Sequence, residues 1–374
     1  MRRAIARIDL GAVERNVANL AARLEGGAEL CAVVKAEGYG HGMVPCARAA
    51  IRGGAKCLAV ATAGEARELR AALGSERIFV MGAMSPEEAD EALAADAEVS
   101  VWSAGFAAGL ARKAADLGVV PRVHVKYDSG MGRLGERDPQ RVSQLIDLVA
   151  TDEHLELAAM WTHFATADDD DHTFMHEQLE RFRTLADGVK HRHPEIALHA
   201  ANSAATIGEP AAHLDMVRCG IAIYGLDPFG RDPSDHGLEP ALELTSWIAD
   251  VKRFEAGASA GYGRTWRAQR DTLVGVIPIG YGDGYRRGLS SLAEVLVGGN
   301  RYPFAGTISM DNSTIDLGPV TNVEAGEEAV LIGARGGEWI RAEDLATVLG
   351  TINYEITCGI SARVPREYVG ASEE

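Results

Sequence analysis

The chain has 374 residues, which is too long for one ordinary domain but suits a barrel with a second domain attached. Its formal net charge of −17 opposes binding to nucleic acid or to an anionic membrane surface. No run approaches the roughly 18 apolar residues of a membrane-spanning helix. These bounds favour a protein that acts on a small molecule.

The cysteines and the first residues bear on where the protein works. The five cysteines are scattered and form no CxxC pair, which is typical of a reducing compartment without structural zinc. At the N-terminus, Arg7 and Asp9 interrupt any apolar stretch that would serve as a signal peptide. We therefore expect a cytoplasmic protein without a metal site.

Short apolar runs that read as strands alternate with helical segments through the first 225 residues. The expected strands are residues 29–37, 57–62, 78–83, 98–103, 122–130, 157–167, 197–206 and 216–225. Between them, residues 63–74, 85–96 and 103–118 have helical apolar spacing, a final glycine or the capping sequence SPEE. Continuous apolar strands alternating with helices predict a parallel sheet covered on both faces. Eight such units predict an α/β fold with a closed, TIM-type (β/α)₈ barrel.

After residue 240 the pattern changes to β-like runs separated by glycine-rich turns. Only residues 341–350 read as a helix there. We therefore expect a barrel over residues 1–240 and a mainly β domain over residues 241–374. About the first ten residues are able to pair with the β domain.

Polar residues stand at or near the ends of the expected barrel strands, where the chemistry of such barrels is located. They are Lys35, Lys126, His163, Asn202, Ser203 and Arg218. One or two of them would be explained as hydrogen-bonded structural groups. So many at one end of a barrel indicate an active site.

Lys35 ends the first expected strand and is followed by a glycine-rich run. Burial of an ammonium lowers its pKa and makes the amine a nucleophile, which forms Schiff bases with carbonyls such as that of pyridoxal phosphate. For this lysine alone, an ion-paired or snorkelling side chain is the alternative. Ser203 and the Gly220–Ile221 backbone follow strands seven and eight, where barrels commonly hold a phosphate, and Tyr39 adds a hydroxyl. The residues thus predict an aldehyde cofactor on Lys35, with glycines that let the backbone turn closely beside it.

Several longer motifs stand in the same order in a known family. They are AVVKAEGYGHG (32–42), KYDSGMGRLG (126–135), THFATAD (162–168), NSAAT (202–206), VRCGIAIYG (217–225), AGYGRTW (260–266), IGYGDGYRR (279–287), GTISMDN (306–312) and SARVPREY (361–368). Through them the chain resembles the alanine racemase family over essentially its whole length. One departure is Glu37, at a position where the family commonly has Asn or Asp.

The resemblance implies that pyridoxal 5'-phosphate is bound as a Schiff base to Lys35 and that the protein interconverts L-alanine and D-alanine, which supplies D-alanine for peptidoglycan. Racemisation removes a proton from one face of Cα and returns one to the other, so two bases are expected. In the family the second base is a tyrosine, here Tyr262, which belongs to the partner subunit of a head-to-tail homodimer with shared active sites.

Supporting roles follow from the same resemblance. Arg218 matches the arginine that donates to the pyridine nitrogen, and His163 matches a histidine bound to that arginine. Arg133 resembles the clamp for the substrate carboxylate, and Lys126 matches a lysine that is carbamylated in many members. The remaining matches are the cofactor ligands Tyr39, Asn202, Ser203, Gly220, Ile221 and Tyr354, and the partner-derived pocket residues Tyr281, Met310 and Asp311.

Four other functions stay open. A racemase with a wider amino-acid range differs only in pocket width, which depends on side-chain placement. A pyridoxal-phosphate decarboxylase of basic amino acids shares the architecture but is expected to lack Tyr262 and Arg218. A pyridoxal-phosphate carrier has no need for Tyr262, and a class I aldolase leaves the phosphate ligands and the β domain unexplained.

Overall fold

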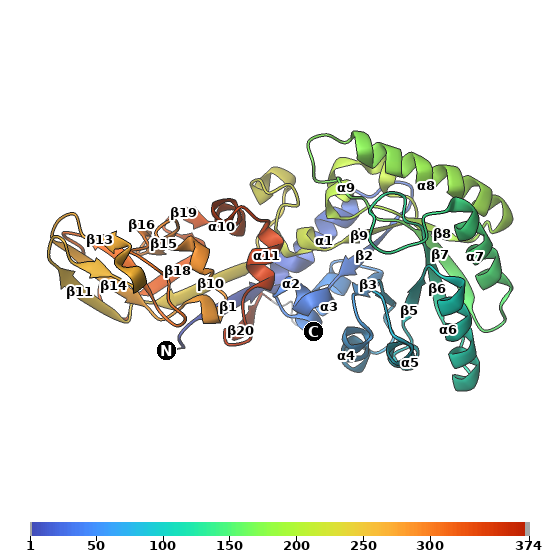
Figure 1. Ribbon diagram of the computed structural model, residues 1–374, viewed down its shortest axis with the longest axis horizontal. Helices are drawn as coiled ribbons and strands as arrows, with labels where there is room; N and C mark the ends of the chain where they lie inside the picture. The colour runs from blue at the N-terminus through green and yellow to red at the C-terminus, as the bar shows by residue number, and fades with distance from the viewer. Residues whose placement is uncertain (1, 371–374) are drawn as a thin grey trace.

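A computed structural model describes residues 2–370 of the protein. Two parts lie side by side and give the molecule an elongated outline, with a helix-ringed barrel at one end and a mainly β part at the other (Figure 1). One continuous cluster of buried apolar side chains runs through both parts. No helix within these residues is long and apolar enough to cross a membrane.

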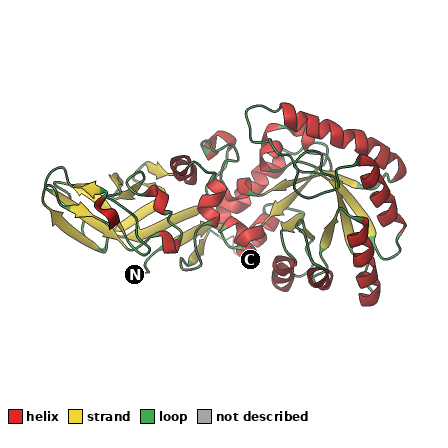
Figure 2. Ribbon diagram, in the orientation of Figure 1, coloured by secondary structure: helices red, strands yellow, loops and turns green. Residues whose placement is uncertain are grey.

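The first part is a closed barrel of parallel strands, which confirms the predicted TIM-type fold (Figure 2). Its strands are β2 (Glu29–Val33), β3 (Cys57–Val60), β4 (Ile78–Val80), β5 (Glu98–Val101), β6 (Arg122–Lys126), β7 (Glu156–Trp161), β8 (Ala197–His199) and β9 (Met216–Cys219). The barrel closes because Cys31 pairs with Arg218 on one side and with Cys57 on the other. All eight strands end earlier than expected, so several predicted strand-end residues lie in the turns that follow.

Helices cover the outside of the barrel (Figure 2). They are α1 (Leu10–Ala22), α3 (Met43–Arg52), α4 (Ala63–Leu73), α5 (Pro86–Ala94), α6 (Ala104–Leu117), α7 (Pro139–Thr151) and α8 (Thr173–Arg192), while the short α2 (Lys35–Tyr39) and α9 (Ser203–Gly208) follow strand ends. The SPEE sequence caps α5 as predicted, since Ser85 and Glu88 bond to each other's backbone N–H groups.

The second part is built mainly from antiparallel strands. They are β1 (Ile5–Asp9), β10 (Leu242–Trp247), β11 (Asp250–Phe254), β12 (Ser259–Ala260), β13 (Trp266–Arg267), β14 (Thr272–Ile277), β15 (Glu294–Val297), β16 (Asn300–Pro303), β17 (Ser313–Gly318), β18 (Glu328–Arg335), β19 (Glu338–Ile340) and β20 (Arg366–Val369). The main sheet runs β16-β15-β18-β10-β1-β20, so the N-terminal strand lies inside it. β1 is antiparallel to β10 and parallel to β20.

Two helices belong to this part rather than one. The predicted helix is present as α10 (Ala342–Leu349) and ends at Gly350 in a left-handed conformation. The expectation of a single helix is wrong, because α11 (Asn353–Cys358) follows it. α11 has only six residues and includes the β-branched Ile356 and Thr357, so its sequence lacks a helical period.

Candidate active site

Lys35 does not end a strand, as its sequence position suggests, but opens the short turn α2. Residues Ala36–Tyr39 all have positive φ angles between 52° and 58°, which makes a left-handed turn. Only one of them is glycine. A left-handed conformation costs about 1–2 kcal/mol for each residue with a Cβ. The glycines expected to let the backbone turn, Gly38, Gly40 and Gly42, all have positive φ angles, but residues with a Cβ share the turn with them.

Contacts from outside the turn hold it in place. The carboxylate of Glu65 accepts from the N–H of Ala36 (2.7 Å) and also from that of Ala61 (2.8 Å), which ties the residue after the lysine to the end of β3. Gly40 allows α11 to approach, because a Cβ there would lie 2.2 Å from the carbonyl oxygen of Thr357. Strain of this kind is typical of functional sites.

A cavity of about 310 Å³ opens beside Lys35 at the carboxyl ends of the barrel strands. The predicted residues that line it are Lys35, Tyr39, Arg133, His163, Asn202, Ser203, Arg218, Gly220, Ile221 and Tyr354. Residues far apart in the sequence therefore meet at one site.

Two lysines near this cavity have a pKa below that of an exposed lysine. Burial lowers the pKa of Lys35, and the nearby Arg133 adds to the effect. Lys126, at the end of β6, lies with Nζ 3.9 Å from the ring centroid of Trp161, and burial and the Arg218 and Arg133 cations lower its pKa to about 7. Both amines are therefore more reactive as nucleophiles than an exposed lysine.

Arg218 on β9 is buried and nearly all of its donors are occupied. Nη2 donates to the carbonyl oxygens of Thr162 (2.8 Å) and Ala200 (2.9 Å) and lies 3.2 Å from Nδ1 of His163. Nη1 lies 2.8 Å from Nδ1 of His199. Nε is also buried but has no hydrogen-bond partner within residues 2–370, so it is left over for a group in the cavity.

Hydroxyl groups gather at another side of the cavity. The Ser203 hydroxyl accepts from the N–H of Gly220 (2.9 Å), and the Tyr39 hydroxyl lies so near Gly220 that a Cβ there would be 2.3 Å from it. The rings of Tyr39 and Tyr354 lie 5.9 Å apart. Burial raises the pKa of both tyrosines, so they stay protonated and able to donate to an anion.

The other predicted site residues lie in the β part and do not reach the Lys35 cavity. Tyr262 is 73% exposed, and β13, which closely follows it, lies at the end of the molecule away from the barrel (Figure 1). Tyr281, Met310 and Asp311 also lie outside the cavity. Tyr281 donates its N–H to the carbonyl oxygen of Ser309, and Tyr262 lines a hollow with Ser309, so the β part has a cluster of its own.

Comparison with known proteins decides the family. A sequence model described as the N-terminal domain of alanine racemase matches residues 8–228, and one described as the C-terminal domain matches residues 241–368. The chain belongs to the alanine racemase family. Alanine racemase of Symbiobacterium thermophilum is 42% identical over 375 aligned residues, which cover 99% of this chain and 98% of the relative. That of Desulfovibrio desulfuricans is 39% identical and covers 97% of each chain.

Solved structures of alanine racemases have the same fold. The crystal structure of the enzyme from Streptomyces lavendulae is 38% identical and superposes with a TM-score of 0.94 over 100% of this chain and 98% of the other. The enzyme from Streptomyces coelicolor is 40% identical, with a TM-score of 0.94 over 99% and 98% of the two chains. This member of the alanine racemase family thus keeps the architecture of its relatives along its whole length.

Several residues that shape the site in this family member were not predicted from the sequence. Met81 and Cys358 line the cavity, and no sequence signal singles them out. Glu65 forms a capping box with Thr62, so its role at the start of α4 is readable, but its bond to Ala36 is not. His199 contacts Arg218 from within β8, where a lone histidine in an apolar run is the only hint.

Proposed function

We propose that this enzyme interconverts L-alanine and D-alanine with pyridoxal 5'-phosphate attached to Lys35. The observation that carries the proposal is the pairing in one cavity of an amine with a lowered pKa and a buried arginine donor, Nε of Arg218, without a partner in the described chain. When bound, this cofactor supplies an electron-withdrawing ring that stabilises negative charge at the Cα of the amino acid.

The residues present fit this cofactor. The cavity of about 310 Å³ falls within the range of small-molecule sites and offers an amine for the aldehyde. Protonated hydroxyls of Tyr39 and Tyr354, with Ser203, Asn202 and the Gly220–Ile221 backbone, suit a phosphate. The unpartnered Nε of Arg218 suits a ring nitrogen.

Arg218 keeps that ring nitrogen from becoming charged. Burial lowers the pKa of its guanidinium only to about 10, so at neutral pH the side chain is a cation that donates and does not accept. A nitrogen that accepts from such a donor is kept unprotonated. The side chain thereby limits how strongly charge is drawn from Cα, which disfavours side reactions, and His163 steadies it from the neighbouring turn.

Two bases then act on opposite faces of the substrate. We assign Lys35 to one face and Tyr262 of the partner subunit to the other, because within one chain Tyr262 is exposed and lies outside the Lys35 cavity. The partner's Tyr281, Met310 and Asp311 complete the site. The N–H of Met310 has no partner within residues 2–370, which suits a contact with the substrate carboxylate.

The proposal extends to the oligomeric state, the cellular compartment and the biosynthetic role of the enzyme. The enzyme is a homodimer of head-to-tail chains, each divided near residue 240 into a barrel domain and a β domain. It works in the cytoplasm and supplies D-alanine for peptidoglycan. The scattered free cysteines support a reducing compartment.

Arg133 binds the substrate carboxylate. Lys126 supports that contact. Arg133 lines the cavity and has no ion pair within the described residues, so its guanidinium suits a bidentate pair with a carboxylate. The side-chain amine of Lys126 has no hydrogen bond or ion pair within the described residues, and the Arg218 and Arg133 cations both lower its pKa. A carbamate at Lys126 converts this repulsion into attraction and steadies Arg133.

We expect the purified enzyme to be yellow, and borohydride reduction tests the cofactor assignment. We expect mass mapping to find the pyridoxyl group on Lys35, since this residue lines the cavity and burial lowers the pKa of its amine. Lys35→Ala serves as the control and should lose both the label and the colour. A pyridoxyl group on another lysine of the wild-type enzyme would refute the assignment.

Carbon dioxide should add to Lys126 as the pH rises through about 7, because only the neutral amine reacts and burial lowers its pKa to about 7. With ¹³C-labelled bicarbonate, the carbamate signal in ¹³C NMR should grow between pH 6 and 8. The matched variant Lys126→Met keeps the packing against Trp161 and should lack the signal. A signal that persists in Lys126→Met, or one that falls with rising pH, would contradict this assignment.

A further inference from the structure

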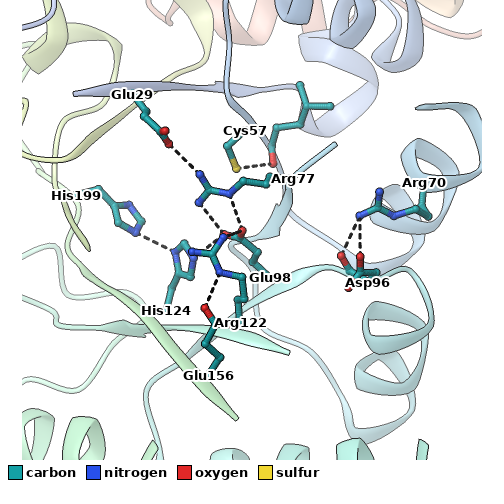
Figure 3. Close-up of polar contacts among 11 residues, drawn as sticks. Glu29, Cys57, Arg70, Arg77, Asp96, Glu98, Arg122, His124, Glu156 and His199 are labelled. Carbon is teal, nitrogen blue, oxygen red and sulfur yellow. Dashed lines mark hydrogen bonds and ion pairs between the residues drawn. The ribbon is translucent and has the colours of Figure 1, made fainter. Parts of the chain in front are cut away.

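A chain of hydrogen-bonded side chains crosses the barrel interior from Arg218 to Glu98. Nη1 of Arg218 lies 2.8 Å from Nδ1 of His199, whose Nε2 lies 3.0 Å from Nδ1 of His124. Nε2 of His124 lies 2.8 Å from Oε2 of Glu98, the first residue of β5 (Figure 3). The most exposed of the four residues is Glu98, at 4%. These buried side chains therefore join the active site to the amino end of the barrel.

The two ends of this chain determine which ring nitrogen carries each proton. A guanidinium only donates, so Nδ1 of His199 accepts and its Nε2–H donates to Nδ1 of His124. Nε2–H of His124 then donates to Glu98. Burial alone would raise the pKa of Glu98, but hydrogen bonds from His124 and Arg77 hold it at about 2, so its carboxylate only accepts. Burial lowers the pKa of both histidines, which keeps them neutral.

Arg218 has no carboxylate partner of its own within the described chain. All its acceptors are neutral: the carbonyl oxygens of Thr162 and Ala200 and the ring nitrogens of His163 and His199. A buried cation is costly without compensation. The polarised hydrogen bonds through the two imidazoles connect it to the negative charge of Glu98.

We propose that Glu98 is a positioning residue for Arg218, acting through His124 and His199 from the opposite end of the barrel. Its carboxylate holds both imidazoles in the tautomer that accepts from Arg218, which leaves Nε as the donor available to the cofactor. This role rests on the proposed function of Arg218 as the partner of the ring nitrogen. Glu98 itself touches neither cofactor nor substrate.

Glu98→Gln should break this arrangement although the two side chains have the same shape. Oε1 of Glu98 accepts from Nε of Arg77 and Nη1 of Arg122, both at 2.8 Å, so only an oxygen suits that position. The amide nitrogen of glutamine then replaces Oε2, which also has a longer 3.3 Å contact with Arg77. An NH₂ group facing Nε2–H of His124 brings two donors together. Either the bond breaks or the tautomers reverse, and reversal brings two donors together at Arg218.

Two substitutions provide matched controls at the same arginines. Glu29 accepts from Nη1 of Arg77 (2.8 Å), and Glu156 accepts from Nε of Arg122 (3.2 Å) (Figure 3). Neither glutamate belongs to the series of hydrogen bonds from Arg218 to Glu98. Glu29→Gln and Glu156→Gln remove one carboxylate from each arginine and leave both tautomers unchanged. They separate the effect on the imidazoles from a loss of charge at the amino end of the barrel.

The test is ¹⁵N NMR of histidine-labelled protein, with and without pyridoxal phosphate. In the unmodified chain both His124 and His199 should carry hydrogen on Nε2 and none on Nδ1. In Glu98→Gln one ring should change tautomer or lose its hydrogen-bonded N–H signal, while the two control variants keep the wild-type pattern. Alanine turnover should fall about tenfold, the low end for loss of an outer partner at metal sites, with little change in KM.

The outcomes distinguish a failure of this proposal from a failure of the proposed function. Hydrogen on Nδ1 of either ring in the unmodified chain would overturn it without recourse to any variant. Wild-type tautomers and full turnover in Glu98→Gln would overturn it as well. The ring nitrogens are observed without cofactor, so failure to bind pyridoxal phosphate would remove the proposed function and leave the tautomer result intact.

Discussion

Dimers mixed from Lys35→Ala and Tyr262→Phe subunits should recover about a quarter of wild-type racemase activity, although each variant alone is nearly inactive. In a mixed dimer with shared sites, one site receives both defects and the other receives neither. Random exchange makes about half of the dimers mixed, and one of their two sites is intact. The structure motivates this test, because Lys35 and Tyr262 of one chain line separate hollows.

The measurement is alanine racemisation before and after subunit exchange under mild denaturant. Exchange itself is followed with subunits of two different masses. Incomplete exchange is thereby excluded as the reason for a lack of activity. A mixture of either variant with itself is the control and should stay inactive. If exchange is complete and activity does not return, Tyr262 does not act across the interface.

Tyr262→Phe should slow exchange of the α-proton of L-alanine by at least about 100-fold, the low end of what a general base contributes. The substitution removes only the hydroxyl, so packing of the ring is preserved. By resemblance to the family, we propose that Tyr262 takes the proton from L-alanine and Lys35 takes it from D-alanine. Exchange from D-alanine should therefore be affected far less.

Deuterium incorporation from heavy water, followed by NMR for each enantiomer, separates the two half-reactions. Tyr302→Phe removes a hydroxyl from β16 at a residue without a proposed role, and should leave both rates unchanged. Equal losses from both enantiomers in Tyr262→Phe would contradict a mechanism with one base on each face.

The barrel and the general position of its site are predictable from the sequence. Fully buried parallel strands need apolar residues on both faces, so β3, β4 and β5 stand out between helices with capping residues. Polar residues at the ends of such strands have few structural explanations. Lys126 and Arg218 were recognisable as site residues for this reason, and they lie at the end of β6 and within β9, as the strand pattern predicts.

The turn after Lys35 was not predictable by the same reasoning. Local preferences disfavour a left-handed conformation at Ala36 and Glu37. The contacts that stabilise it come from Glu65 and from the close approach of α11 at Gly40, which are distant in sequence. The preferences of single residues carry no information about such contacts.

The series of hydrogen bonds from Arg218 to Glu98 was also not predictable from the sequence. His124 and His199 are visible as single histidines within their strands, and each alone is as well explained by a local backbone bond. Only the register of the closed barrel places the two rings 3.0 Å apart at their nitrogens. Tyr262, in turn, was found by resemblance to a family motif and not by any periodicity.

The position of β1 affects the order in which the protein can fold. This strand precedes the barrel in the sequence, yet its neighbours β10 and β20 both follow the barrel and are separated from it by more than the whole barrel sequence. Contacts of such high sequence separation form slowly, because the intervening chain must be ordered first. The main sheet therefore cannot be completed until the barrel and β20 have both been synthesised. A fragment that starts after the barrel would lack an inner strand and expose two unpaired edges, so it should aggregate rather than fold alone.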